Sequence, residues 1–221
     1  LQTAFPMLVA QVLNLLYSIV DRVYIGRIPG AGTEALGAVG LCFPIIILVT
    51  GFTNMFGLGG APLFSMALGQ GNREKAIDIQ NTALRLLVLV GAGILLVVEL
   101  LGDRILLLFG ATTGELSLAL PYLRIYLIGT IFIMVSTGMN AYINAQGFPV
   151  IGMISVTIGA ASNLILDPLF IFGWKLGVSG AAVATVLSQL LSFLFVLSFL
   201  FGKKNELPVC FAWSFPYAGA I

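Results

Sequence analysis

The stretch SNLILDPLFIFGW, residues 162–174, has the character of a hydrophobic helix, yet it carries an Asp followed directly by a Pro. In a lipid-facing segment a buried carboxylate and a missing backbone N–H both cost free energy, because no water is available to satisfy the unpaired groups. Pro168 cannot donate a hydrogen bond to the carbonyl of Leu164, which leaves an oxygen acceptor free near Asp167. We therefore interpret this stretch as a membrane helix built around a polar site.

The composition also indicates a membrane protein. Of the 221 residues, 59% are hydrophobic and 9% are charged, whereas soluble domains carry about 25% charged residues. The net charge of +1 argues against a nucleic-acid partner. With no His, and with two Cys that lack ligand spacing, the chain offers neither a disulfide framework nor a typical metal site, so no cofactor is expected. Because it starts at Leu1 without a Met, we expect the chain to be a fragment at its N-terminus.

Long intervals without charged residues predict where the chain crosses the bilayer, because one span needs about 20 largely apolar residues. The interval 125–166 is long enough for two spans, and the turn sequence NAQGFPV divides it. The interval 35–72 contains glycines and a proline, so we interpret it as one long, bent helix. The predicted fold class is an all-α polytopic membrane protein, a bundle of six transmembrane helices at about 1–26, 34–69, 76–101, 117–145, 150–173 and 179–202. The distribution of Lys and Arg over its loops favours a cytoplasmic N-terminus.

Asp21 and Asp167 are the two acids most embedded in apolar sequence. The first and fifth helices cross the membrane in the same direction. Asp21 lies five residues before Gly26, and Asp167 lies six before Gly173. At 1.5 Å per residue, both carboxylates should lie about 8–9 Å inside the same end of the bundle. We therefore expect the two acids to share one leaflet.

Polar residues on four helices follow helical spacing near these acids. Asn14, Tyr17 and Asp21 form one stripe, and Asn163 lies one turn before Asp167. Unpaired polar groups in lipid are driven to the bundle interior, so the stripes should converge there. Oxygen ligands of this kind suit Na⁺ or a proton better than softer metals. The fourth and sixth helices add Thr137, Asn140, Asn144, Thr185, Ser188 and Gln189.

Simpler interpretations of the same residues stay open. Asp167 could be an interfacial helix-end residue paired with Lys175, and Asp21 could form an ordinary ion pair with Arg22. Polar and aromatic side chains also serve as contacts between helices or as interfacial belt residues. Asn140 and Asn144 could serve only as contacts between helices, and the interfacial belt interpretation applies to Tyr17, Tyr122, Tyr126 and Trp174.

The order of motifs resembles the N-terminal half of a multidrug and toxic compound extrusion (MATE) transporter, in the DinF-like branch of the MOP flippase superfamily. The motifs are NLLYSIVDRVYIGR after Pro6, ALGAVGLCFPI, SMALGQGNREKA, PYLRIYLIG, NAQGFP, NLILDPLFIFG and GVSGAAVATVLSQ. The resemblance implies one lobe of a twelve-helix, two-lobe protein. Residues 1–202 would form this six-helix lobe, and residues 203–221 would be the start of the inter-lobe connection or a divergent tail.

The resemblance further implies a secondary active antiporter of the plasma membrane that exports organic, often cationic drugs or toxins in exchange for Na⁺ or H⁺. Its partners would be a small organic substrate, the lipid bilayer and a second six-helix lobe that this chain lacks. The implied coupling-ion site comprises Asp21, Asn163, Asp167 and Thr185. The surrounding polar network and substrate cleft would include Asn14, Tyr17, Tyr122 and Asn140, and the first helix would bend at Pro6.

Other functions stay open at this point. Lipid-linked precursor flippases share the superfamily architecture, and a truncated lobe would transport nothing. An intramembrane aspartyl protease would also use two aspartates. Such proteases carry a G-x-G-D motif, whereas Asp21 follows SIV and Asp167 follows LIL. We therefore expect no enzymatic activity.

Overall fold

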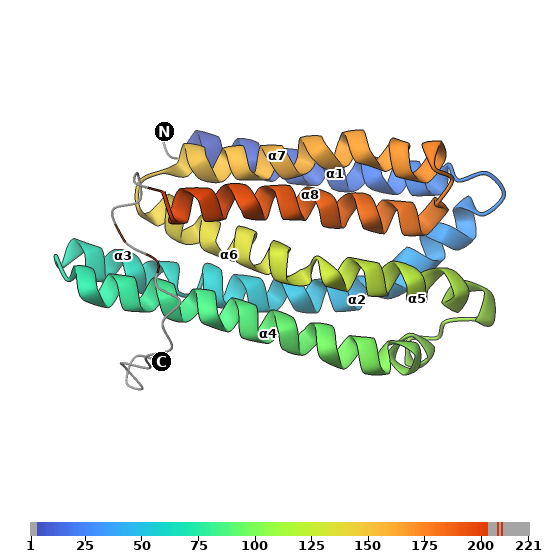
Figure 1. The fold of residues 1–221 in the computed structure, drawn as a ribbon, viewed down its shortest axis with the longest axis horizontal. Helices are drawn as coiled ribbons and strands as arrows, with labels where there is room; N and C mark the ends of the chain where they lie inside the picture. The colour runs from blue at the N-terminus through green and yellow to red at the C-terminus, as the bar shows by residue number, and fades with distance from the viewer. Residues whose placement is uncertain (1–3, 203–206, 208, 210–221) are drawn as a thin grey trace.

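The computed structural model describes residues 4–202, 207 and 209, which form a bundle of helices aligned along one long axis (Figure 1). In chain order the elements are α1 (Ala4–Gly26), α2 (Gly32–Gly57), α3 (Ala61–Gly69), α4 (Arg73–Leu108), α5 (Thr113–Ile128), α6 (Thr130–Ala145), α7 (Pro149–Pro168), the π-helical turn η1 (Leu169–Gly173) and α8 (Gly177–Leu200). The prediction of an all-α fold is confirmed.

Up to six segments have the length and composition of membrane spans. Five of them are α1, the joined α2 and α3, α4, the joined α7 and η1, and α8. The sixth is the pair α5 and α6, which is bent by 50°. Large apolar side chains also cover the outside of the bundle, among them Leu96 and Leu100 on α4. Such a surface is stable only against lipid or another apolar partner, so the chain is a polytopic membrane protein.

The segment expected as one bent helix over 34–69 is divided in the structure. A break of three residues separates α2 from α3. A Cβ on Gly60 within the break would overlap the hydroxyl of Tyr142, so a larger residue does not fit there. The same hydroxyl donates to the backbone carbonyl of Phe56 over 2.7 Å, which satisfies an acceptor at the end of α2. The break is therefore held by a specific contact with α6.

The segment expected as one helix over 117–145 bends between α5 and α6, and the two helices meet at Gly129. A Cβ on Gly129 would overlap Oε1 of Gln189 and lie 3.0 Å from Cγ2 of Val186. The absence of a side chain therefore lets α8 approach the bend closely.

Two further helices differ from the expected bounds. α4 begins before and ends after the expected 76–101. Its start is capped by the side chain of Asn72, which accepts a hydrogen bond from the backbone N–H of Lys75 over 3.0 Å. The α-helical part of the segment 150–173 ends at Pro168, and the chain continues as η1. A proline lacks the N–H that continues the α-helical ladder, and a π-helical turn is one way to accommodate that loss.

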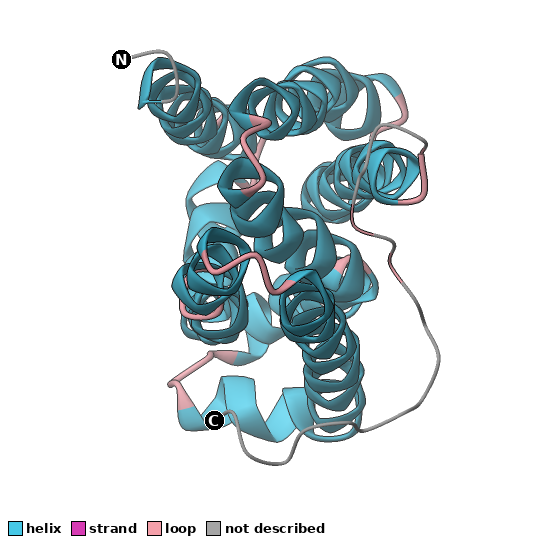
Figure 2. Cartoon of the chain, turned by 90° about the vertical axis from the view of Figure 1, so that its left-hand side faces the viewer, coloured by secondary structure: helices cyan, strands magenta, loops and turns pink. Residues whose placement is uncertain are grey.

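The helix contacts link α1, α7 and α8 with one another and, through α6, with α2 and α4. α7 contacts both α1 and α8, while α6 contacts α2, α4 and α8. Figure 2, which looks along the helices, shows these neighbours end-on. Buried hydrophobic side chains form two clusters, one around Phe64 and Leu84 and the other around Ile25 and Leu123. Most of the expected tail, residues 203–221, lies outside the described residues.

Candidate functional site

A buried polar cluster forms where α1, α7 and α8 meet. Asp167 has no exposed surface, and Asn163, one turn earlier on α7, is 3% exposed. The Nδ2 of Asn163 donates to Oδ1 of Asp167 over 3.2 Å and to Oγ1 of Thr185 over 3.4 Å. The carboxyl group of Asp21 lies within hydrogen-bonding reach of that of Asp167. The structure therefore brings together Asp21, Asn163, Asp167 and Thr185.

Several oxygen atoms of this cluster have no hydrogen-bond partner among the described residues. They are Oδ1 of Asp21, Oδ1 of Asn163 and Oδ2 of Asp167. A buried acceptor without a partner is rare and marks a place where a proton, an ion or a water is needed. Ionised carboxylates only accept hydrogen bonds, so Asp21 and Asp167 can face each other stably only when a proton or a cation lies between them. The cluster is thus chemically suited to hold a proton or a small cation.

The helix-end interpretation of Asp167 does not fit this geometry. Asp167 is fully buried against Asn163 and Asp21, so pairing with Lys175 at the interface is wrong. The guanidinium of Arg22 lies 5.2 Å from the ring centroid of Phe43 on α2. Asp21 reaches Asp167 on α7 and is also close enough to Arg22 for electrostatic attraction, so an interaction between Asp21 and Arg22 stays open.

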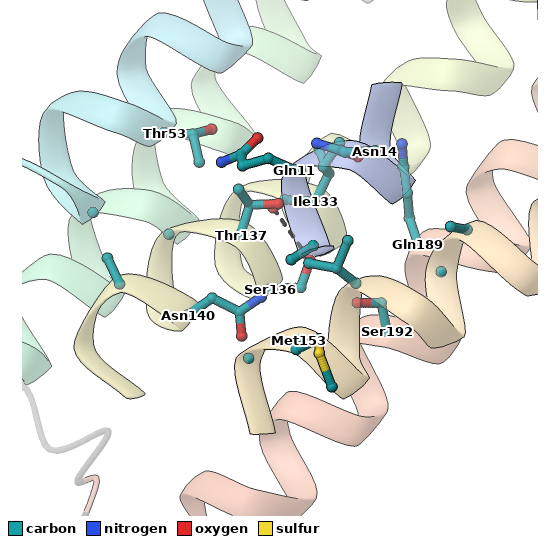
Figure 3. A pocket seen from close by; sticks show the side chains of 18 of the residues that line it. Gln11, Asn14, Thr53, Ile133, Ser136, Thr137, Asn140, Met153, Gln189 and Ser192 are labelled. Atoms are coloured by element: carbon teal, nitrogen blue, oxygen red, sulfur yellow. Dashed lines mark hydrogen bonds between the residues drawn. The ribbon is translucent and has the colours of Figure 1, made fainter. Parts of the chain in front are cut away.

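A pocket of about 210 Å³ adjoins the cluster (Figure 3). Asn163 and Thr185 line this pocket and also belong to the cluster, so the two sites share a wall. The other polar side chains of the lining come from α1, α2, α6 and α8, and include Gln11, Asn14, Thr53, Thr137, Asn140 and Gln189. The pocket can therefore offer many neutral hydrogen-bonding groups to a small molecule.

The two tyrosines of the expected polar network lie beside the acids. Tyr17 and Tyr122 are both close enough to Asp21 and Asp167 to interact with them electrostatically. Tyr17 also lines the pocket, whereas Tyr122 is buried and stacks on Tyr126, with ring centroids 6.1 Å apart. For Tyr122 and Tyr126 the interfacial belt interpretation is therefore wrong.

The remaining expected residues are spread along the lobe. Asn14 and Asn140 line the pocket, where Asn140 donates to Ser155 of α7. Pro6 lies in the first described turn of α1, where a proline is tolerated, and α1 continues as one helix to Gly26. A bend at Pro6 stays a prediction.

Two buried serines form a polar contact beside the pocket, and the sequence reasoning missed both; Ser192 of this pair lines the pocket. Oγ of Ser155 on α7 lies 2.9 Å from Oγ of Ser192 on α8, and Nδ2 of Asn140 donates to Ser155 Oγ over 3.4 Å. Ser155 lies eight residues before Asn163, and Ser192 seven after Thr185. These are about two helical turns, so extending the polar stripes of α7 and α8 would have found the pair.

The sequence model of the MatE family matches residues 6–169. The chain belongs to the MATE family. The multidrug export protein MepA of Staphylococcus haemolyticus (strain JCSC1435) is 29% identical over 203 residues, which cover 92% of this chain and 44% of MepA. MepA of Staphylococcus aureus (strain MSSA476) is 27% identical over 206 residues, covering 93% of this chain and 45% of that protein.

Solved structures give the same result for the fold. A MATE protein in the straight conformation matches with a TM-score of 0.88 at 27% identity, over 95% of this chain and 46% of its own. An outward-facing multidrug resistance MATE transporter of the MOP superfamily matches with a TM-score of 0.86 at 26% identity, over 93% of this chain and 45% of its own. The chain thus spans about half the length of its relatives and corresponds to the N-terminal half of a MATE protein.

Proposed function

We propose that this MATE half is one lobe of a secondary antiporter that exports small organic, often cationic compounds in exchange for Na⁺ or H⁺. The observation that carries the proposal is the contact between the carboxyl groups of Asp21 and Asp167 beside a polar pocket. The names of the staphylococcal relatives, which are multidrug export proteins, support the same assignment. No enzymatic step and no organic cofactor belong to this mechanism.

The proposed coupling-ion site consists of Asp21, Asn163, Asp167 and Thr185. When both carboxylates are ionised in this dry site, their repulsion pushes α1 away from α7. A shared proton, or Na⁺ held by the carboxylate, amide and hydroxyl oxygens, removes the repulsion and draws the two helices together. The bend of α1 at Pro6 would accompany this movement.

The residues that the ion cluster shares with the pocket couple ion binding to substrate binding. Asn163 and Thr185 contact the ion cluster on one side and the pocket on the other, so ion binding changes the shape and the free donors of the pocket. Two ligands that favour different states of one lobe weaken each other's binding, and antiport depends on that reciprocal effect. Asn14, Tyr17, Tyr122 and Asn140 would tune the two states as the surrounding polar network.

In the complete transporter, the substrate cleft also needs a boundary on the side opposite this lobe. Its relatives are about twice as long as this chain, and we propose that a second six-helix lobe closes the substrate cleft. Alternating access then arises from movement of one lobe against the other. We further propose that the protein lies in the plasma membrane with its N-terminus in the cytoplasm.

The test uses the complete protein in liposomes, with a fluorescent organic cation as substrate and an imposed Na⁺ or H⁺ gradient. Asp167→Asn and Asp21→Asn should each abolish gradient-driven transport, because an amide cannot take up the coupling proton or provide the charge that holds Na⁺. Asp103→Asn serves as the control, since Asp103 is an exposed carboxyl on α4 outside the cluster. Transport by Asp167→Asn that stays gradient-driven at the wild-type rate would refute the proposal. A wild-type protein that moves a lipid-linked precursor but no organic cation would favour the flippase alternative.

A further inference from the structure

A second cavity lies between α2 and α4 and shares no lining residue with the polar pocket. Its volume of about 420 Å³ is in the range of cavities that hold small ligands. Every residue that lines it is apolar, including Ile45, Leu48 and Phe52 on α2 and Gly93, Val97 and Val98 on α4. Below we call this cavity the α2–α4 groove. Its chemistry excludes an organic cation as the ligand, because a charge would find no partner there.

The groove is open toward the side of the bundle. Its floor includes Ile45 and Val98, which are both buried, while Leu48 and Val97 on its walls are 49% and 48% exposed. At Gly93 the absent side chain leaves a gap, since an added Cβ would meet no heavy atom within 4 Å. Both helices belong to candidate membrane spans, and the exposed apolar walls of the groove match the hydrocarbon of a bilayer.

A cation lies along the same face of α4. Arg104 follows Val97 by seven residues and Gly93 by eleven, which are two and three turns of the helix. It is exposed in the last turns of α4, next to Ile105, which lines the end of the groove. The nearby acid Glu99 lies on another face and pairs with Arg124 of α5 over 3.5 Å. The groove therefore leads along α4 toward an arginine in the last turns of the span.

We propose that the α2–α4 groove binds an anionic phospholipid of the bilayer, with one acyl chain in the groove and the phosphate at Arg104. An acyl chain has the apolar chemistry of the lining and is present at high concentration beside it. A guanidinium matches a phosphate with two parallel hydrogen bonds, which ties the lipid head to the end of the groove. The groove is separate from the ion cluster. A failed lipid-binding test would therefore leave the proposed antiport function standing, and a failed transport test would leave the lipid proposal standing.

The test measures lipid binding to the complete protein by native mass spectrometry, with phosphatidylglycerol and phosphatidylcholine as probes. The wild type should retain one phosphatidylglycerol in preference to phosphatidylcholine. Gly93→Phe fills the groove and should weaken retention of both lipids by about tenfold or more, the effect of excluding about two methylene groups from apolar contact. Gly93→Ala gains at least as much helix propensity as Gly93→Phe, leaves the groove open and should bind as the wild type does.

The head-group contact is tested separately. Arg104→Gln should weaken phosphatidylglycerol binding by about tenfold, as expected for the loss of a charge-assisted hydrogen bond, while Arg104→Lys should weaken it less, because the ammonium keeps the charge but not the paired hydrogen bonds. Leu48→Trp fills the groove from α2 if Gly93→Phe does not fold, and Leu96→Phe adds bulk on the outer face of α4 as a control. If the groove-filling variants retain lipid as strongly as the wild type, the retained lipid is non-specific surrounding lipid and the proposal is overturned. A preference for phosphatidylglycerol that survives Arg104→Gln would overturn the phosphate contact.

Discussion

Gly57→Ala should destabilise the lobe, because Gly57 faces a backbone and not a flexible side chain. A Cβ at Gly57 of α2 would lie 2.8 Å from Cα and 2.9 Å from the carbonyl oxygen of Gly138 on α6. Real Cβ atoms do not approach other heavy atoms so closely, so α2 and α6 must move apart. The two glycines thus set the spacing of these helices, as small residues commonly do in membrane proteins.

The magnitude follows from the cost of overpacking. Inserting a methyl group into a closely packed contact costs about 1–3 kcal/mol. At about 2–4 °C per kcal/mol for a chain of this size, the apparent Tm should fall by about 2–12 °C. Gly138→Ala should have a smaller effect, because its Cβ would meet the tip of the Leu87 side chain at 2.6 Å, and that side chain can rotate. Gly51→Ala is the matched control on α2, since its Cβ would meet nothing within 4 Å.

Thermal unfolding can be followed with a thiol-reactive dye in a Cys210→Ser background, because the remaining thiol, Cys42, is buried and reacts only when the bundle opens. Gly51→Ala should be neutral, or more stable by at most about 1 kcal/mol through its helix propensity. The expected order of Tm is Gly51→Ala highest, Gly138→Ala next and Gly57→Ala lowest. A Tm for Gly57→Ala at or above that of Gly51→Ala would refute the backbone contact between α2 and α6.

Two further predictions concern local hydrogen bonds. Thr112 caps α5, and its side chain and that of Glu115 bond each other's backbone N–H groups, so Thr112→Ala should lower the free energy of unfolding by about 0.5–2 kcal/mol. Thr112→Ser keeps the cap, and an equal loss of Tm in both variants would contradict this reason. Tyr142→Phe removes the bond to the Phe56 carbonyl and should cost about 0.5–1.5 kcal/mol in denaturant unfolding. An unchanged midpoint would mean that this bond does not hold the break between α2 and α3.

The shared leaflet of the two acids could be predicted from the sequence, because a membrane strongly restricts the direction and depth of each helix. The direction of a span alternates along the chain, and depth follows from the number of residues to the end of a helix. These two rules are enough to put Asp21 and Asp167 in one leaflet. The step from the same leaflet to direct contact needed the packing of α1 on α7, which only the structure provides.

The breaks within helices could not be placed from the sequence. Glycines are frequent in this chain, and most of them do not interrupt a helix. Both breaks lie where a side chain of another helix approaches closely, Tyr142 at Gly60 and Gln189 at Gly129. Such long-range contacts leave no local pattern, so the segment over 117–145 looks continuous. The α2–α4 groove could not be predicted from the sequence either, because apolar residues that line a groove have the same sequence pattern as apolar residues on any lipid-facing surface.

In the proposed mechanism, the low burial of α1 within the lobe indicates which helix would respond to the coupling ion. In its apolar window only 6% of the residues of α1 are buried, against 28% in the span formed by α7 and η1. A helix with few buried contacts costs the least free energy to displace. Within this lobe, Asp21 therefore lies on a lightly buried span, and its partner Asp167 lies on a span packed between α1 and α8. A charge change between these two acids would move α1 rather than α7, so the response to the ion would begin in the helix that carries Gln11, Asn14 and Tyr17 into the pocket.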